Sequence, residues 1–388
     1  MKRDGLRIET IRARDLQTFF LNYAQQAENQ EISPISQYRA ESQSQNPYAD
    51  EADPGLLAAY MGDRCVGYQG IVPGLLRTTS GLSKVYWCTA AYVLPEFRKR
   101  MVAIQLIKKL TSLKKDIVLT GFDSVVADVF KGFHFQEIGP LRYCTLRPDR
   151  LDPFSYPFRR FYRLQKKWPV LRKLSESAIA MSRRLSYPGV RRAFYSSVAR
   201  RAEKALGNVR WRELSRVEGF DGLPCAEAGK PHFERDSKAI NWMLAYPWIR
   251  EGAAPTRPPY YFSEAYESFR YAVLAIDGRE GCGSSGVTLS LLRDRGESKL
   301  KVLDLQCDKQ DLDVIFWLIC RYAAKHQADE IEMPAEFESR IALLPLGLTA
   351  MKQEQRRYLC HPSSQSSPLA AALPELTLSL CDGDCAFT

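Results

Sequence analysis

The chain has 388 residues, enough for two to three domains of ordinary size. Its composition is 45% hydrophobic, 11% aromatic and 26% charged, which excludes collagen-like, coiled-coil and intrinsically disordered chains. The net charge is +10, but residues 147–212 alone hold 18 Lys and Arg against 4 Asp and Glu, a net charge of +14. The rest of the chain therefore carries −4, and one basic segment lies in the middle of a nearly neutral protein.

No segment of the sequence suggests export, membrane spanning or metal binding. Residues Met1–Arg7 lack the apolar core of a signal peptide. The longest strongly apolar run, Val314–Cys320, has seven residues, whereas a membrane-spanning helix needs about 20. The ten cysteines are scattered without CxxC spacing, and only four histidines accompany them. We expect buried free thiols, no metal site and a cytoplasmic location.

Block one, residues 1–148, alternates strand-like and helix-like hydrophobic patterns. Its expected elements, in chain order, are a strand at Leu6–Thr10, a helix at Asp15–Ala27, a loop at Ser36–Asp53, strands at Leu56–Tyr60, Cys65–Val72 and Val85–Val93, a helix at Ala103–Leu113, a strand at Ile117–Thr120, a helix at Ser124–Gly132, and one or two strands within Phe135–Leu146.

Block two, residues 149–212, mixes paired cations with aromatic residues and is broken by Pro169 and Pro188 into short helices. Three interpretations compete. In the first, the block is an interdomain helical linker whose cations face water. In the second, residues 150–205 lie on anionic lipid at the inner membrane face. In the third, the block binds RNA. RNA is the least favoured of these, so we do not expect nucleic acid as a partner.

Block three, residues 213–388, repeats the order of block one. Its expected elements are a helix at Ser237–Ala245, strands at Tyr271–Ile276, Val287–Leu292 and Leu300–Gln306, a helix at Leu312–Lys325, a strand at Glu330–Met333, a helix at Glu336–Leu344, a strand at Met351–Cys360, a linker at Pro362–Pro368 and a strand at Leu376–Leu380. The shared order predicts an α/β (α+β, mixed-sheet) fold of two lobes joined by the basic helical segment.

The most informative run is Ala91-Tyr-Val-Leu-Pro-Glu-Phe-Arg-Lys-Arg-Met-Val-Ala103, where a strand meets a helix. A helix N-terminus offers unpaired N–H groups and partial positive charge to a phosphate. The run resembles the acyl-CoA signature of the GNAT superfamily of N-acyltransferases, Arg-x-x-Gly-x-Gly/Ala, at Arg98, Met101 and Ala103. Val129–Phe135 resembles that family's Tyr-x-x-x-Gly-Phe element. The resemblance covers block one and extends weakly, through strand order, to block three.

The resemblance implies a co-substrate, acetyl-CoA or another acyl-CoA, without a metal. It also implies that the strand carrying the motif splays from its neighbour, so that its backbone binds the pantetheine arm. The residues it assigns to acyl-CoA are Val93, Arg98, Lys99, Arg100, Met101, Val102 and Ala103. This chain departs from the family pattern where Met101 replaces the central Gly and Phe130 replaces the Tyr that often protonates the leaving thiolate.

Few residues are candidates for general acid–base catalysis. Asp123 and Asp128 lie near a predicted strand–helix junction, and Tyr143 lies on the closing strand. Each is a candidate catalytic residue, with a capping or surface role as the alternative. The segment Phe233–Trp248 either lines a groove between the lobes or packs a helix on its sheet through its aromatic residues.

The predicted function is transfer of an acyl group from acyl-CoA to an amine acceptor. Association within the family suggests an amino sugar in surface-glycan biosynthesis. One alternative is a non-catalytic tandem GNAT scaffold that binds a membrane or partner. Another is a Fem-type transferase that uses aminoacyl-tRNA.

Overall fold

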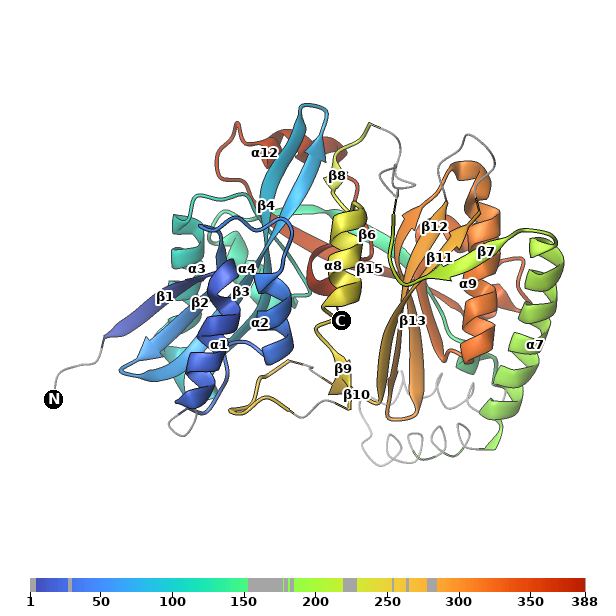
Figure 1. The fold of residues 1–388 in the computed structure, drawn as a ribbon, viewed down its shortest axis with the longest axis horizontal. Coiled ribbons are helices and arrows are strands. Elements are labelled where there is room, and N and C mark those ends of the chain that lie inside the picture. Colours follow the sequence, from blue (N-terminus) through green and yellow to red (C-terminus); the bar gives the residue numbers. More distant parts are fainter. Residues whose placement is uncertain are drawn as a thin grey trace. The chain divides into compact units, whose positions relative to one another are not determined.

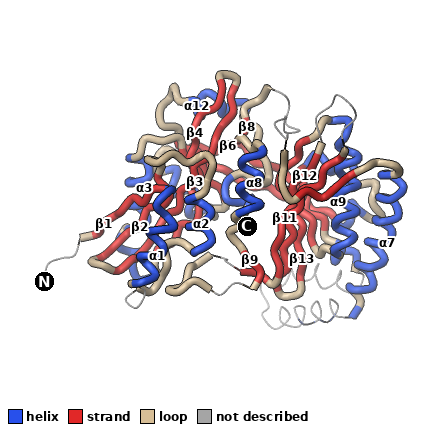
Figure 2. The backbone as a smooth tube through the Cα atoms, viewed as in Figure 1, coloured by secondary structure: helices blue, strands red, loops and turns tan. Residues whose placement is uncertain are grey.

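The computed structural model describes residues 5–26, 30–152, 185–218, 229–252, 255–262, 265–277 and 285–387, together with residues 177 and 181. The chain forms two compact units (Figure 1). The first unit contains Met1–Leu141, Ser215–Phe269 and Arg356–Thr388, and the second contains Arg142–Leu214 and Arg270–Gln355. Both combine helices with strands that pair in parallel and antiparallel fashion, so the predicted mixed α/β class is confirmed (Figure 2).

The first unit is built on a sheet in the order β1-β2-β3-β4-β5, followed by the end of β15. Its strands are β1 (Leu6–Arg12), β2 (Pro54–Met61), β3 (Arg64–Thr78), β4 (Gly81–Val93), β5 (Ile117–Thr120) and the short β8 (His232–Phe233), β9 (Arg250–Glu251) and β10 (Ala265–Tyr266). Its helices are α1 (Leu16–Gln25), α2 (Gln37–Ser44), α3 (Val102–Ser112), α4 (Ser124–Lys131), α8 (Ser237–Ala245) and α12 (Pro368–Ala372). Apolar faces of β1 to β5 and of helices α1 to α4 form one buried core.

The second unit holds a sheet in the order β14-β13-β12-β11-β7, with the end of β6 beside β14. Its strands are β7 (Trp211–Leu214), β11 (Ser268–Ile276), β12 (Gly286–Asp294), β13 (Glu297–Gln306) and β14 (Glu330–Pro334). Its helices are α7 (Tyr187–Leu206), α9 (Leu312–His326), α10 (Glu338–Ile341) and α11 (Gly347–Ala350). Helix α9 is apolar around most of its surface because α7 packs along it (Figure 1).

Two strands carry the chain from one unit to the other. Strand β6 (Gln136–Leu146) begins in the first unit, and its last residues pair with β14 of the second. Strand β15 (Met351–His361) begins in the second unit, and its last residues pair with β5 of the first. The units therefore differ from the predicted blocks 1–148, 149–212 and 213–388, since residues 215–269 and 356–388 lie with the first unit.

Two predicted segments are wrong, both through tertiary contacts. The expected loop at Ser36–Asp53 contains helix α2, which Ser36 caps by accepting the Arg39 N–H and whose polar side chains are buried. The expected strand at Leu376–Leu380 is not formed, and Thr377 makes a single bridge to His232. The predicted free thiols are confirmed for the described cysteines, of which all but Cys385 are buried.

The described part of the basic segment is helix α7, whose first turn contains Pro188. Its aromatic residues Tyr187, Phe194 and Tyr195 are buried in the second unit, while most of its cations are exposed. The predicted membrane contact through 150–205 therefore has no support in this helix, because its aromatic rings are not presented to lipid. Residues 153–176, with Pro169, lie outside the described chain. Among the described helices, none is both long and apolar enough to cross a membrane.

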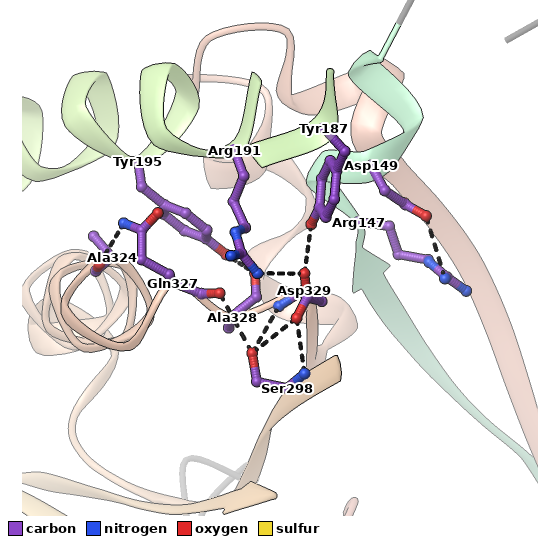
Figure 3. Close-up of polar contacts among 10 residues, drawn as sticks. All are labelled: Arg147, Asp149, Tyr187, Arg191, Tyr195, Ser298, Ala324, Gln327, Ala328 and Asp329. Carbon is purple, nitrogen blue, oxygen red and sulfur yellow. Dashed lines mark hydrogen bonds and ion pairs between the residues drawn. The ribbon is translucent and has the colours of Figure 1, made fainter. Parts of the chain in front are cut away.

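The Asp329 carboxylate fixes α7 to the second unit (Figure 3). Its Oδ1 accepts the Tyr187 hydroxyl at 2.8 Å and an Arg191 Nη1 hydrogen bond at 2.7 Å. Its Oδ2 accepts the Ser298 N–H at 2.8 Å. The neighbouring Tyr195 hydroxyl donates to the Ala328 carbonyl at 2.6 Å. Helix α7 is thus an integral part of the second unit, because Tyr187, Arg191 and Tyr195 attach it there.

We predict that Asp329→Asn lowers the free energy of unfolding by about 2–3 kcal/mol, because a neutral amide cannot pair with Arg191 and also accept from Tyr187, the Ser298 N–H and the Ser298 hydroxyl, which lies 3.0 Å from Oδ2. Asp294→Asn is the control, because Asp294 faces the exposed Arg295 at 3.8 Å and such surface pairs contribute at most about 1 kcal/mol. Urea unfolding followed by circular dichroism measures both. Equal effects of the two substitutions would contradict the role of Asp329.

Candidate functional site

The end of strand β4 separates from β5. Strand β4 pairs with β3 as far as Val93, but with β5 only over Tyr86–Cys88. Ala90 forms a bulge with φ of +43°, and the Gln69 side-chain amide secures it by donating to the Thr89 carbonyl at 2.7 Å. Backbone groups of residues 89–93 on the β5 side consequently have no strand partner in the described chain.

A tight turn after β4 leads into an uncapped helix. Residues Pro95–Arg100 form a 3₁₀ turn anchored by the buried Phe97, and Met101 follows with φ of +60°. No side chain caps α3, and the Gln105 N–H bonds to the Met101 carbonyl at 3.0 Å. The N–H groups of the three residues before Gln105 lie in the first turn, where no helical carbonyl precedes them. They are therefore available to an anion.

Three cations surround this helix terminus. Arg98, Lys99 and Arg100 are exposed, and within the described residues none is ion-paired with a carboxylate. Arg98 Nε donates to the Val93 carbonyl at 3.2 Å, and the Arg100 guanidinium lies 5.1 Å from the centroid of the Phe97 ring. Val102 is buried under the turn, and Ala103 is exposed. This arrangement of free amides and unpaired cations suits a diphosphate.

The carboxylate in this turn, that of Glu96, already forms an ion pair. Glu96 accepts from Arg64 at 2.5 Å, and Arg64 also pairs with Glu31 at 2.6 Å. Backbone hydrogen bonding and Arg64 hold the pKa of Glu96 below its ordinary value. Glu96 is therefore a poor general base near neutral pH.

The predicted acid–base residues belong to two different units, Asp123 and Asp128 to the first and Tyr143 to the second. Asp123 is the N-cap of α4, where its Oδ1 accepts the Val126 N–H at 2.8 Å. Asp128 is exposed on the same helix. Tyr143 falls in the second unit, in register with Pro334. Phe130, at the family's Tyr position, is 5% exposed and packs against Phe135 with ring centroids 4.9 Å apart.

Beside α4 lies an ion pair that sequence spacing does not reveal, because its members are far apart in the chain. Arg357 of β15 binds Glu137 of β6 through two hydrogen bonds of 2.7 and 3.0 Å, and Lys131 adds a third contact at 3.1 Å. These cations lower the pKa of Glu137 to about 2. Glu137 thus remains an anion that orders this edge of the sheet, and it is too weakly basic to accept a proton from an ammonium group.

No His, Cys, Asp and Glu side chains of the described residues gather into a group that would hold a metal ion. The described cysteines do not form a nucleophilic site either, since burial raises the pKa of Cys65 to about 12, with smaller effects from hydrogen bonds. Burial raises the pKa of the Cys360 thiol to about 12 as well. A thiol with such a pKa holds little thiolate at neutral pH.

Comparison with known proteins gives remote structural likenesses. No family model matches the chain, and no curated protein matches it significantly. Solved structures that resemble it include a GCN5-related N-acetyltransferase from Anabaena variabilis, with 11% identity, 93% of this chain and 73% of that chain covered, and a TM-score of 0.45. Another is a tandem GNAT protein from the clavulanic acid biosynthesis pathway, with 10% identity and a TM-score of 0.43. The match covers 94% of this chain and 100% of that chain.

A third similar structure is the N-myristoyltransferase of Saccharomyces cerevisiae with bound myristoyl-CoA, with 10% identity, coverages of 92% and 79%, and a TM-score of 0.47. All three TM-scores lie below 0.5. We therefore draw neither the fold nor the activity of this chain from these likenesses.

A substitution at Asp123 separates capping from catalysis. We predict that Asp123→Ala lowers the free energy of unfolding by about 1 kcal/mol through loss of the cap, whereas Asp123→Ser leaves it nearly unchanged because Ser caps equally well. Thermal unfolding measures both. If Asp123→Ser is stable but loses any acyl-transfer activity of the wild type, the carboxylate has a catalytic role beyond the cap.

Proposed function

We propose that the first unit binds acyl-CoA at the β4–α3 turn and transfers its acyl group to an amine. The observation that carries this proposal is Met101, which takes the left-handed conformation usual for Gly while its side chain is 57% exposed. The side chain therefore points into solvent and leaves the first turn of α3 open. Arg98, Lys99 and Arg100 would bind the diphosphate with the amides of Val102 and Ala103.

The pantetheine arm would follow the backbone of residues 89–93, which has no strand partner on the β5 side in the described chain, and an N–H near Val93 would stabilise the oxyanion. The amine nitrogen attacks the thioester carbonyl carbon, an N–C bond forms and the C–S bond breaks. The amine loses one proton, and the CoA thiolate gains one. Asp128, which is exposed and caps nothing, is the better candidate for accepting that proton, with Asp123 and Tyr143 as the other candidates.

The finer assignments are proposals of the same kind. An amino sugar used in surface-glycan biosynthesis is one candidate acceptor, and the cytoplasm is the proposed location. The second unit would act as a degenerate GNAT-like partner. The specific observation favouring a non-catalytic scaffold is Phe130, whose buried ring cannot protonate a thiolate. Catalysis then requires solvent or another residue in that role.

Removing one phosphate contact tests the binding site. We predict that Arg98→Ala raises the Kd for acetyl-CoA roughly tenfold, because a charge-assisted hydrogen bond to phosphate contributes about 1.5–3 kcal/mol. Isothermal calorimetry measures it, with Lys108→Ala as the control because Lys108 is an exposed cation further along α3. Absence of binding by the wild type to acetyl-CoA and to longer acyl-CoAs would refute the proposed function.

The left-handed position gives a second test. We predict that Met101→Gly raises the free energy of unfolding by about 1 kcal/mol, because a side chain in this conformation costs about 1–2 kcal/mol. It should also tighten acetyl-CoA binding by opening the turn further. Lys114→Gly is a matched control, since Lys114 has φ of +52° at the other end of α3. It should gain similar stability with no change in acetyl-CoA affinity.

A further inference from the structure

A second feature of the first unit, the buried Arg39 guanidinium, is not used by the acyl-CoA site. Arg39 lies on α2 and is 2% exposed. Its Nε and Nη1 atoms are buried and have no hydrogen-bond acceptor among the described residues. A buried charged donor without an acceptor is strongly unfavourable. Arg39 therefore needs an acceptor that the described chain does not supply.

Aromatic rings cover the faces of this guanidinium. Its central carbon lies 4.2 Å from the Trp248 ring centroid, 5.4 Å from that of Tyr260 and 5.9 Å from that of Phe262. Cation–π contact stabilises the charge through the flat faces. It leaves the N–H bonds, which lie in the guanidinium plane, without partners. A planar carboxylate accepts two in-plane hydrogen bonds along one edge of a guanidinium, from Nη2 together with either Nε or Nη1.

Two indole hydrogen bonds attach Trp242 and Trp248 to helix α2. The indole N–H of Trp248 donates to Ser42 Oγ at 2.9 Å, and that of Trp242 donates to the Ser42 carbonyl at 2.7 Å. A second arginine near the same helix, Arg250, does have its carboxylate, Glu41, at 3.0 Å. Helix α2 thus carries an acidic residue, but that residue pairs with Arg250. Among the described residues, Arg39 is left without a carboxylate.

One turn along α2, Gln43 is also 2% exposed, and its Oε1 has no hydrogen-bond donor among the described residues. An unpaired donor and an unpaired acceptor therefore lie one turn apart on one buried face. A ligand that satisfies both carries a carboxylate and an N–H or O–H group. An amine that also bears a carboxylate meets this requirement.

Ring contacts connect these residues to the end of β4. Tyr260 stacks on Tyr68 of β3 with centroids 5.8 Å apart, and Tyr68 lies opposite Tyr92 of β4. Tyr92 immediately precedes Val93, where the proposed thioester site begins. Tyr261 stacks on Tyr92 at 4.1 Å. A chain of ring contacts, from Tyr260 through Tyr68 to Tyr92, thus runs from Arg39 to the end of β4.

We propose that Arg39 binds the carboxylate of the acceptor, so that the substrate class is an amine carrying a carboxylate, such as an amino acid. The role of this ligand as an acceptor rests on the proposed acyl transfer. Binding of a carboxylate at Arg39 can be tested without acyl-CoA. A neutral amino sugar lacks the group that Arg39 requires. Arg39, Gln43, Trp248, Tyr260 and Phe262 form what we call the Arg39 subsite.

The first test is calorimetric binding of acetate, benzoate, the twenty amino acids, phenethylamine, cadaverine and glucosamine to the full chain. We expect phenylalanine to bind at least tenfold more tightly than phenethylamine, or lysine at least tenfold more tightly than cadaverine, because each amine lacks the carboxylate. Arg39-dependent binding of another amino acid would also meet the expectation. Arg39→Met should abolish that binding and leave the acetyl-CoA Kd unchanged. Arg14→Met is the control, since its donors already bond to the Ser44 and Ala49 carbonyls.

The second test remains informative if Arg39→Met does not fold. Gln43→Glu places a carboxylate one turn from Arg39, so we expect a higher melting temperature and at least a tenfold loss of carboxylate binding. Gln45→Glu, on the exposed side of the end of α2, should change neither. A lower melting temperature for Gln43→Glu would show that Arg39 already has its partner, which overturns the proposal.

The outcomes distinguish the two proposals. Arg39-dependent carboxylate binding without any acyl-CoA binding refutes acyl transfer and keeps the subsite. Acyl-CoA binding with no Arg39-dependent binding of any carboxylate, or with preference for glucosamine, refutes the subsite and keeps acyl transfer.

Discussion

The fold depends on hydrogen-bond pairing on both sides of two very short strands, because buried backbone N–H and C=O groups need partners. β5 has four residues and β14 has five, and each pairs in parallel with a strand of its own unit. The second neighbour comes from far along the chain, β15 for β5 and β6 for β14. This pairing places residues 356–388 in the first unit and residues 142–214 in the second.

The candidate site follows from the same sheet. β5 pairs with only three residues of β4, so the bulged end of β4 is supported by β3 alone. The chain must then turn sharply into α3, and Met101 adopts a left-handed conformation to do so. The turn leaves amides and cations facing solvent. The acyl-CoA site proposed at this point would thus be a consequence of incomplete pairing in the sheet.

Two charged side chains of this protein, Asp329 and Arg39, differ in their hydrogen bonding. Asp329 receives hydrogen bonds from Tyr187, Arg191 and Ser298, and it serves to attach a helix. Arg39 is buried more deeply, at 2% exposed against 13% for the Asp329 side chain, and it has stacked rings in place of acceptors. Removing a partner from a buried charge is costly, and the Arg39 donors lack acceptors among the described residues that the proposed carboxylate would supply. This difference gives the Arg39 subsite its functional interpretation.

Much of the local structure could be predicted from the sequence, because hydrophobic periodicity and turn residues act over short distances. The strands from β2 to β5, helices α3 and α9, and the cation-rich turn at Arg98–Arg100 were all predictable in this way. Helix α2 was not, because its polar residues are helical only through burial against Trp242 and Trp248, about 200 residues away. Strand partners, the grouping of segments into units, the core position of Phe130 and the unpaired donors of Arg39 depend on contacts between distant segments. Short-range sequence patterns do not encode such contacts, so only the tertiary structure decided them.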